Sequence, residues 1–218
     1  MTRVGVHFES VKGQFSRLSR MNSALAGKRP PFRFRPETPM SDEDLIRFCA
    51  ANDIARVERD VDGEILVMSP AGTRTGRRNA AIISALDTWA QGDGRGYVFD
   101  SSTGFTLPDG SMRSPDAAWV EAGRWDVLTK TEQNRFSPLC PDFLIELRSP
   151  TDGLSALEAK MERWIANGAK VAWLIDPESR VVLMYRPGCQ PEVQHNPSST
   201  QGTGIIAGFE LSMARIWQ

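Results

Sequence analysis

The chain alternates between segments with the apolar spacing of helices and shorter segments with the period of strands. Apolar residues three or four positions apart predict helices in SDEDLIRFCAAND, TGRRNAAIISALDTWAQGD and LSALEAKMERWIANG. Short apolar or alternating runs predict strands in ARVERD, GEILVMSP, YVFDSSTGFTL, SMRSPDAAWV, FLIELR, KVAWLID and RVVLMY. This mixed order, with one clear strand–helix–strand unit over residues 143–176, predicts an α/β fold in which helices flank a mixed β-sheet.

Capping and turn residues set the boundaries of several predicted elements. Ser41 with Asp44 three positions later is typical of a helix start. The Asp62-Gly63 pair between two short strands is a strong hairpin signal. We expect a loop over residues 121–139, and the turn-rich C-terminal tail predicts one or two edge strands.

Length and composition indicate an ordinary globular chain. With 218 residues, of which 40% are hydrophobic, the chain can bury a substantial single core. The absence of a long apolar run or a secretory signal predicts a cytoplasmic protein with no membrane span. The cysteines Cys49, Cys140 and Cys189 are widely spaced, which favours reduced thiols over a disulfide framework or a clustered zinc site.

Charge is distributed unevenly along the chain. Residues 1–36 carry eight Lys or Arg against one acidic residue, or +7, which leaves 18 basic and 26 acidic residues, or −8, in the remainder. We therefore expect residues 1–40 to form a basic, disordered or loosely attached arm, and residues 41–218 to form the folded domain. An acidic body argues against strong non-specific binding of nucleic acid, for which the basic arm could compensate.

Two carboxylates stand at the ends of predicted strands and are candidates for chemistry. Glu146 interrupts the apolar run FLIELR, and Asp116 follows Pro115 at the start of another strand. A buried carboxylate is costly unless a cation, a proton or a metal neutralises it. If the strands are neighbours, Asp116 and Glu146 can together bind Mg²⁺ or Mn²⁺. The alternatives are that Asp116 caps local backbone groups and that Glu146 forms an ion pair with Arg148 on the same strand face.

Lys160 is the best candidate for a basic group that orients water and offsets negative charge. Its helical neighbours one turn away are Ala156, Leu157, Arg163 and Trp164. Because none of them is a carboxylate, the usual surface ion pair of a helical lysine is not possible, and simple solvation is the remaining alternative. Arg148 competes for the role, but its guanidinium stays protonated and is a poor general base.

These residues resemble a known nuclease signature. Pro115-Asp116 followed by Glu146-Leu147-Arg148 is similar to the PD-(D/E)XK motif, with Arg148 in the lysine position. The blocks RVERDVDGEILVMSPAGTRTGRRNAAII, RSPDAAWV and PDFLIELRSPTDGLSALEAKMERWIANGAKVAWLIDPESRVVLMYRPG resemble, in this order, the Uma-type putative restriction endonuclease family, long catalogued as a domain of unknown function. The resemblance covers about residues 41–218.

The resemblance implies a restriction-endonuclease-like core with a metal held by Asp116 and Glu146. It further implies that Glu58 contributes from an early strand and that the lysine has moved onto the following helix, as Lys160. Read from its local sequence alone, Glu58 could equally be a surface residue of its strand. The family's "E..SP.D" stretch is matched by Ser149 and Asp152.

Several arginines are candidates for contacts with nucleic acid. Arg74, Arg77 and Arg78 cluster at the start of a predicted helix, where the dipole favours phosphate, although such arginines are more often solvated. Arg148 is a fourth candidate, with an electrostatic role. The first hypothesis is an Mg²⁺- or Mn²⁺-dependent endonuclease acting on DNA, with a homodimer favoured if both strands are cut. The second is a catalytically degenerate member of the same fold that binds nucleic acid or a protein partner.

Overall fold

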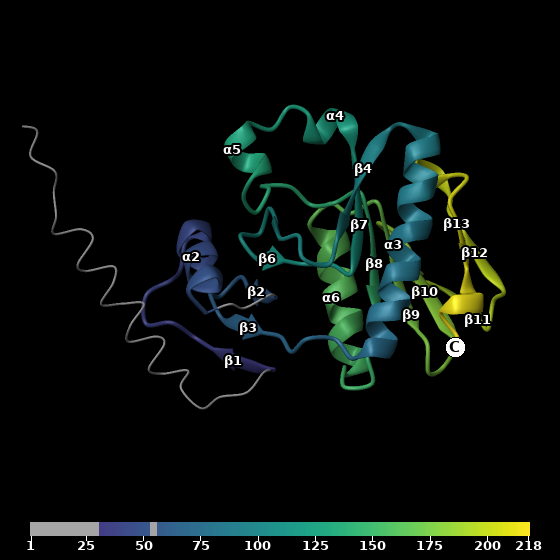
Figure 1. The fold of residues 1–218 in the computed structure, drawn as a ribbon, viewed down its shortest axis with the longest axis horizontal. Helices are drawn as coiled ribbons and strands as arrows, with labels where there is room; N and C mark the ends of the chain where they lie inside the picture. The colour runs from purple at the N-terminus through teal and green to yellow at the C-terminus, as the bar shows by residue number, and fades with distance from the viewer. Residues whose placement is uncertain (1–30, 53–55) are drawn as a thin grey trace, which may run out of the picture.

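The computed structural model describes residues 31–52 and 56–218, and its largest element is a mixed sheet (Figure 1). Its strands lie in the order β11-β10-β9-β8-β7-β4. Their bounds are β4 (Gly96–Asp100), β7 (Ala117–Glu121), β8 (Phe143–Leu147), β9 (Val171–Asp176), β10 (Val181–Tyr185) and β11 (Glu192–His195). β8 pairs in parallel with β9, and the other neighbours pair antiparallel. The predicted α/β fold with a mixed sheet is therefore confirmed.

A smaller sheet lies beside the larger one, in the order β1-β3-β2-β6-β5. Its strands are β1 (Phe32–Phe34), β2 (Val57–Arg59), β3 (Ile65–Val67), β5 (Phe105–Thr106) and β6 (Met112–Arg113). Helix α2 (Asp42–Asn52) covers this sheet, because Leu45 and Phe48 pack against Val57 and Ile65 in a separate apolar cluster. A short hairpin of β12 (Ser199–Gln201) and β13 (Glu210–Ser212) forms a third unit.

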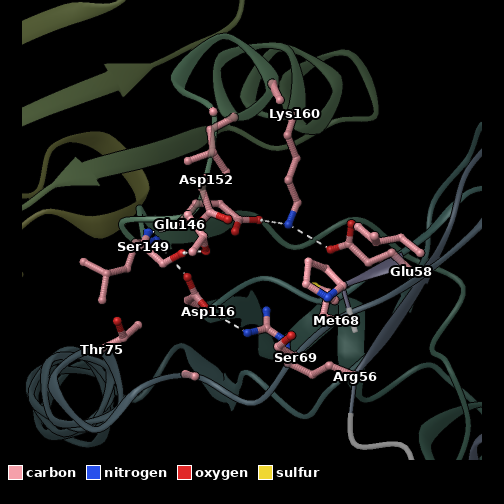
Figure 2. Close-up of a pocket in the computed structure, with 18 of the residues that line it drawn as sticks. Arg56, Glu58, Met68, Ser69, Thr75, Asp116, Glu146, Ser149, Asp152 and Lys160 are labelled. Carbon is pink, nitrogen blue, oxygen red and sulfur yellow. Dashed lines mark hydrogen bonds and ion pairs between the residues drawn. The ribbon is translucent and has the colours of Figure 1, made fainter. Parts of the chain in front are cut away.

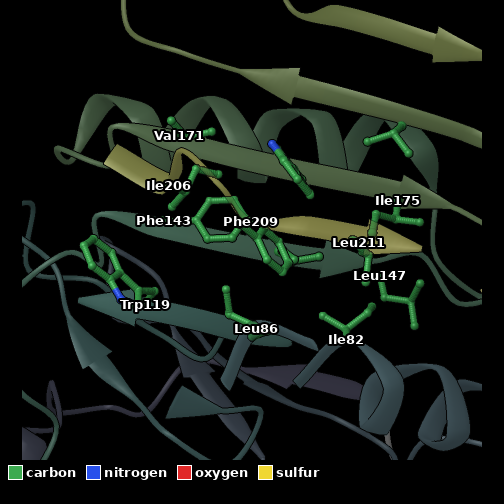
Figure 3. Close-up of a cluster of buried hydrophobic side chains, with 14 of the residues drawn as sticks. Ile82, Leu86, Trp119, Phe143, Leu147, Val171, Ile175, Ile206, Phe209 and Leu211 are labelled. Atoms are coloured by element: carbon green, nitrogen blue, oxygen red, sulfur yellow. The ribbon is translucent and has the colours of Figure 1, made fainter. Parts of the chain in front are cut away.

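Helices cover both faces of the larger sheet, and strand alternation decides which residues meet which helix. On β8, Phe143, Ile145 and Leu147 share an apolar cluster with Ile82 and Leu86 of α3 (Thr73–Asp93). Figure 3 shows this cluster closed by residues of the C-terminal segment, among them Phe209 and Leu211. Leu144 of β8 instead meets Met161 and Trp164 of α6 (Leu154–Ala166). Glu146 therefore belongs to the face that α6 covers.

Several local predictions hold in the structure. Ser41 caps α2, since its Oγ accepts from the backbone N of Asp44 at 3.1 Å while Asp44 accepts from the backbone N of Ser41 at 3.2 Å. β2 and β3 form the predicted hairpin, in which Gly63 adopts a φ of 82°. The strand–helix–strand unit over residues 143–176 is present as β8, α6 and β9.

Other segments differ from the predictions. β1 lies within the expected arm of residues 1–40, because its apolar side chains pair with β3 and complete the small sheet; residues 1–30 lie outside the described residues. The predicted loop of residues 121–139 contains the short helices α4 (Ala122–Trp125) and α5 (Lys130–Gln133). The two long strands expected over residues 97–120 are broken into β4 to β7, and β5 and β6 join the small sheet. Short 3₁₀ turns, η1 (Gly204–Ile206) and η2 (Met213–Arg215), occur in the C-terminal segment.

The described residues contain no helix that is both long and apolar enough to cross a membrane. The three cysteines are free thiols.

Candidate active site

Asp116 and Glu146 converge at the same end of strands β7 and β8. The antiparallel register pairs Ala117 with Ile145, so the next pair outward places Asp116 opposite Glu146. Oδ2 of Asp116 accepts a hydrogen bond from the backbone N of Leu147 on the neighbouring strand at 2.8 Å, so Asp116 does more than cap its own turn. The two acidic residues are only 7% and 3% exposed. The structure thus brings together two buried carboxylates that lie 30 positions apart in the sequence.

Lys160 reaches from α6 into this cluster and bridges two carboxylates (Figure 2). Its Nζ lies 2.8 Å from Oε1 of Glu58 and 2.8 Å from Oε1 of Glu146. Glu58, on β2 of the small sheet, is 3% exposed and is not a surface strand residue. The lysine therefore connects the two sheets, and the alternative of a solvated surface lysine is wrong because both partners come from distant strands.

Other side chains complete the cluster, and sequence reasoning missed them. Arg56 donates through Nη1 to Oδ1 of Asp116 at 3.0 Å and through Nη2 to the carbonyl of Ser114 at 2.9 Å. Arg113 donates to Oε2 of Glu58 at 3.2 Å. These contacts span more than 50 positions of sequence, and no local pattern carries a signal for them.

Burial and charge set the protonation states in this cluster. Burial raises the pKa of Glu146 to about 7, with the neighbouring carboxylates of Asp116 and Glu58 adding to the effect and Lys160 opposing it. Burial acts to lower the pKa of Lys160, but the two glutamates outweigh it and raise that pKa above its usual value. For Glu58, burial is likewise outweighed, by Lys160 and then Arg113, so its pKa is lowered. Lys160 is thus a permanent ammonium, suited to donating hydrogen bonds and not to accepting a proton.

Arg148 does not pair with Glu146, so the ion pair considered from the sequence is wrong. β8 ends at Leu147, and the strand alternation that would have put the two side chains on one face ends with it. Arg148 donates instead through Nη1 to Oδ2 of Asp176, at the end of β9, at 2.7 Å. Its Nε donates to the carbonyl of Asp152 at 3.2 Å. Arg148 therefore ties together the loops beyond two strand ends.

The arginines at the start of α3 have different surroundings. Arg77 donates through Nη2 to the Gln218 side chain at 2.6 Å, and Arg78 donates to the Gln218 main-chain carbonyl at 3.0 Å. Arg78 is buried, and its pKa is lowered by burial and by the neighbouring arginines Arg74 and Arg77. Arg74 is exposed at the wall of the cavity described next.

The carboxylates and Lys160 line a cavity with a volume of about 880 Å³. Its walls come from β2 and β3, the start of α3, the loop after β8, and α6. Figure 2 shows Ser149 and Asp152 on the loop side of the cluster. The backbone N of Ser149 donates to Oδ2 of Asp152 at 2.9 Å, so this pair fixes the loop between β8 and α6. The cluster is therefore buried in the protein yet accessible from one open side.

This arrangement of fold and site agrees with the comparison against protein families. The Uma2 family, described as "Putative restriction endonuclease", matches residues 42–214. The chain belongs to the Uma2 family. A search of curated proteins finds no match.

Solved structures share the Uma2 fold of this chain. A crystal structure of a "putative nuclease belonging to DUF820" from Anabaena variabilis superimposes with a TM-score of 0.67 at 18% sequence identity. The match covers 82% of this chain and 98% of the Anabaena chain, so nearly the whole of that protein is represented here. A cryo-EM structure of a DrdV–DNA complex matches with a TM-score of 0.34 at 18% identity, over 54% of this chain and 10% of the other.

The donor set of this Uma2 member fits a hard divalent cation in part. Within residues 31–52 and 56–218, no group of three or more His, Cys, Asp or Glu side chains is arranged to hold a metal. Asp116 and Glu146 do offer adjacent carboxylate oxygens beside an open cavity. Mg²⁺ usually takes one or two protein carboxylates and completes its shell with water and substrate oxygens. The pair Asp116 and Glu146 would hold such an ion.

Proposed function

We propose that this protein is a metal-dependent endonuclease that uses Mg²⁺ or Mn²⁺ to hydrolyse phosphodiester bonds in DNA. The observation that best supports the proposal is the single buried cluster at the cavity wall, in which Lys160 lies against Glu146 and Asp116 stands opposite. Membership of the Uma2 family agrees with it. When bound, the ion would polarise the phosphodiester and lower the pKa of an attacking water.

Each side chain of the cluster has a proposed role. Asp116 and Glu146 would hold the ion through their carboxylate oxygens. Lys160, as a permanent ammonium, would orient the water and offset the negative charge that develops on the phosphate. Glu58 holds Lys160 in place in this structure and would serve as an accessory ligand or base.

DNA is the proposed substrate, and the arginines would position it. Arg74, at the start of α3, lines the same cavity as the carboxylates and would contact a backbone phosphate. Arg77, Arg78 and Arg148 lie beside the site and would add positive charge along the path of the strand. A homodimer would place two such sites on the two strands of a duplex.

Cleavage of supercoiled plasmid DNA tests the proposal. We expect nicking by the wild-type protein to require Mg²⁺ or Mn²⁺ and to be lost in Glu146→Gln and in Asp116→Asn, because each change removes one carboxylate of the proposed metal pair. Glu162→Gln is the matched control, since Glu162 is an exposed glutamate on α6. Equal trace activity in the wild type and in Glu146→Gln would mean contamination, and the proposal would fail.

A second candidate function is a nuclease fold without catalysis, which binds nucleic acid or a protein partner. It is favoured by the fact that the carboxylates already have basic partners: Lys160 for Glu58 and Glu146, and Arg56 for Asp116. Calorimetry with Mn²⁺ separates the two candidates. Absence of Mn²⁺ binding, together with DNA affinity that is unchanged in Asp116→Asn, would support the non-catalytic candidate.

A further inference from the structure

Trp164 has a polar contact that its place on the apolar face of α6 does not suggest. The residue is 1% exposed and packs among apolar side chains between α6 and the larger sheet. Its indole Nε1 donates a hydrogen bond to Oε1 of Glu146 at 3.0 Å. A buried indole therefore contacts one of the two proposed metal ligands directly.

The same oxygen of Glu146 also receives Lys160. Nζ of Lys160 lies 2.8 Å from Oε1 of Glu146, and Lys160 and Trp164 are four positions apart on α6. Residues at this spacing point from successive turns toward the same side of a helix. Two donors from one helix thus hold Oε1, whereas in the described part of the chain no hydrogen bond is found to Oε2.

Other buried tryptophans show that this contact is specific to position 164. Nε1 of Trp119 and Nε1 of Trp173 are buried and have no hydrogen-bond partner among the described residues. Packing alone therefore does not force an indole N–H in this core onto an acceptor. At position 164 the N–H meets a charged oxygen, where hydrogen bonds are shorter and stronger than those between neutral groups.

We propose that Trp164 is a positioning residue for the metal site: together with Lys160 it fixes Oε1 of Glu146 to α6, so that Oε2 is the oxygen presented to the cation. The inference rests on the proposed metal-dependent function and assigns a role to a residue that touches neither metal nor DNA. Partners that orient a metal ligand typically change metal affinity by about 10- to 100-fold when removed.

Calorimetric titration with Mn²⁺ alone tests the inference on the full chain. We expect Trp164→Phe, which keeps a large apolar ring but removes the N–H, to bind Mn²⁺ about tenfold more weakly than the wild type. Trp173→Phe is the matched control, because Trp173 is equally buried but its N–H has no partner among the described residues. It should bind Mn²⁺ as the wild type does. Equal affinity of Trp164→Phe and the wild type would overturn the inference and leave the metal-dependent function standing.

A measurement on the unchanged protein covers the case in which Trp164→Phe does not fold. In ¹⁵N-labelled wild type, the assigned indole N–H signal of Trp164 should shift as Mg²⁺ is added, following the binding curve, while that of Trp173 stays in place. A Trp164 signal that does not move while Mg²⁺ binds would overturn the inference alone. Failure of the wild type to bind either cation would instead overturn the proposed function, and this inference with it.

Discussion

At the scale of single residues, the site depends on a lysine whose partners lie far away in the sequence. Lys160 has no carboxylate within one helical turn, and it meets Glu58 and Glu146 from two different sheets. Removing one partner from a buried ion pair leaves an uncompensated charge, which is strongly destabilising. The cluster therefore couples the protonation of one carboxylate to the charges around it, and a bound cation would enter this balance.

Metal affinity should depend on pH near neutrality, because burial raises the pKa of Glu146 to about 7. Below that pKa the carboxyl group holds a proton that a cation must displace, so Mn²⁺ binding should weaken as the pH falls. From about pH 8 to about pH 6 we expect a loss of about tenfold, with release of a proton on binding at the lower pH. Calorimetry in two buffers of different ionisation enthalpy, with oxygen excluded, measures both quantities.

A glutamate with an ordinary pKa would be ionised at both pH values. Equal Mn²⁺ affinity across this range, without proton release, would therefore contradict the raised pKa of Glu146.

At the scale of elements, local signals predicted the parts of the fold that they encode. The apolar run of β8 and the helical spacing of α6 gave the strand–helix–strand unit, and their periodicity placed Glu146 toward Lys160. β5 and β6 span two residues each, which is too short for a period of two to be recognised. The pairing of Arg56 with Asp116 joins positions 60 apart and depends on tertiary packing alone. The sequence therefore indicated the carboxylates and the lysine but not the arginines that surround them.

Close packing at the edge of the larger sheet gives a prediction for strand β4. A Cβ atom on Gly96 would lie 2.4 Å from the carbonyl oxygen of Val120 and 2.5 Å from the ring of Trp119. Gly96→Ala should push β4 away from β7 and lower the free energy of unfolding by about 1–3 kcal/mol. Urea unfolding followed by circular dichroism measures the change.

Gly92 provides the matched control for that substitution. It lies in α3, and a Cβ there would meet no atom within 4 Å. Gly92→Ala should raise the free energy of unfolding by about 0.5–1 kcal/mol, since alanine loses less backbone entropy in a helix. If Gly96→Ala were as stable as the wild type, the tight contact between β4 and β7 would be wrong.

At the scale of the whole molecule, charged contacts join the two sheets around the cavity. Lys160 and Arg163 of α6 pair with Glu58 and Asp60 of the small sheet's side, the Arg163 contact being 2.7 Å. These bridges fix the small sheet and its helix α2 against the helix that carries the proposed catalytic lysine. The folded part of the chain is acidic, so a negatively charged polymer must be attracted by local groups of basic residues or by the basic N-terminal segment.

The basic N-terminal segment should contribute to DNA binding and leave metal binding unchanged. Residues 1–30 carry six Lys or Arg and one acidic residue. Each phosphate contact that is lost flattens the dependence of log K on log salt concentration by about 0.9 for duplex DNA. A variant that starts at residue 31 should therefore bind a labelled duplex more weakly at low salt and with a slope flatter by several such steps, as measured by fluorescence anisotropy. Its Mn²⁺ affinity should equal that of the full chain, because Asp116 and Glu146 are untouched. Identical salt slopes for the two proteins would show that residues 1–30 make no phosphate contacts, and the attraction for DNA would then have to come from Arg74 and its neighbours at the cavity.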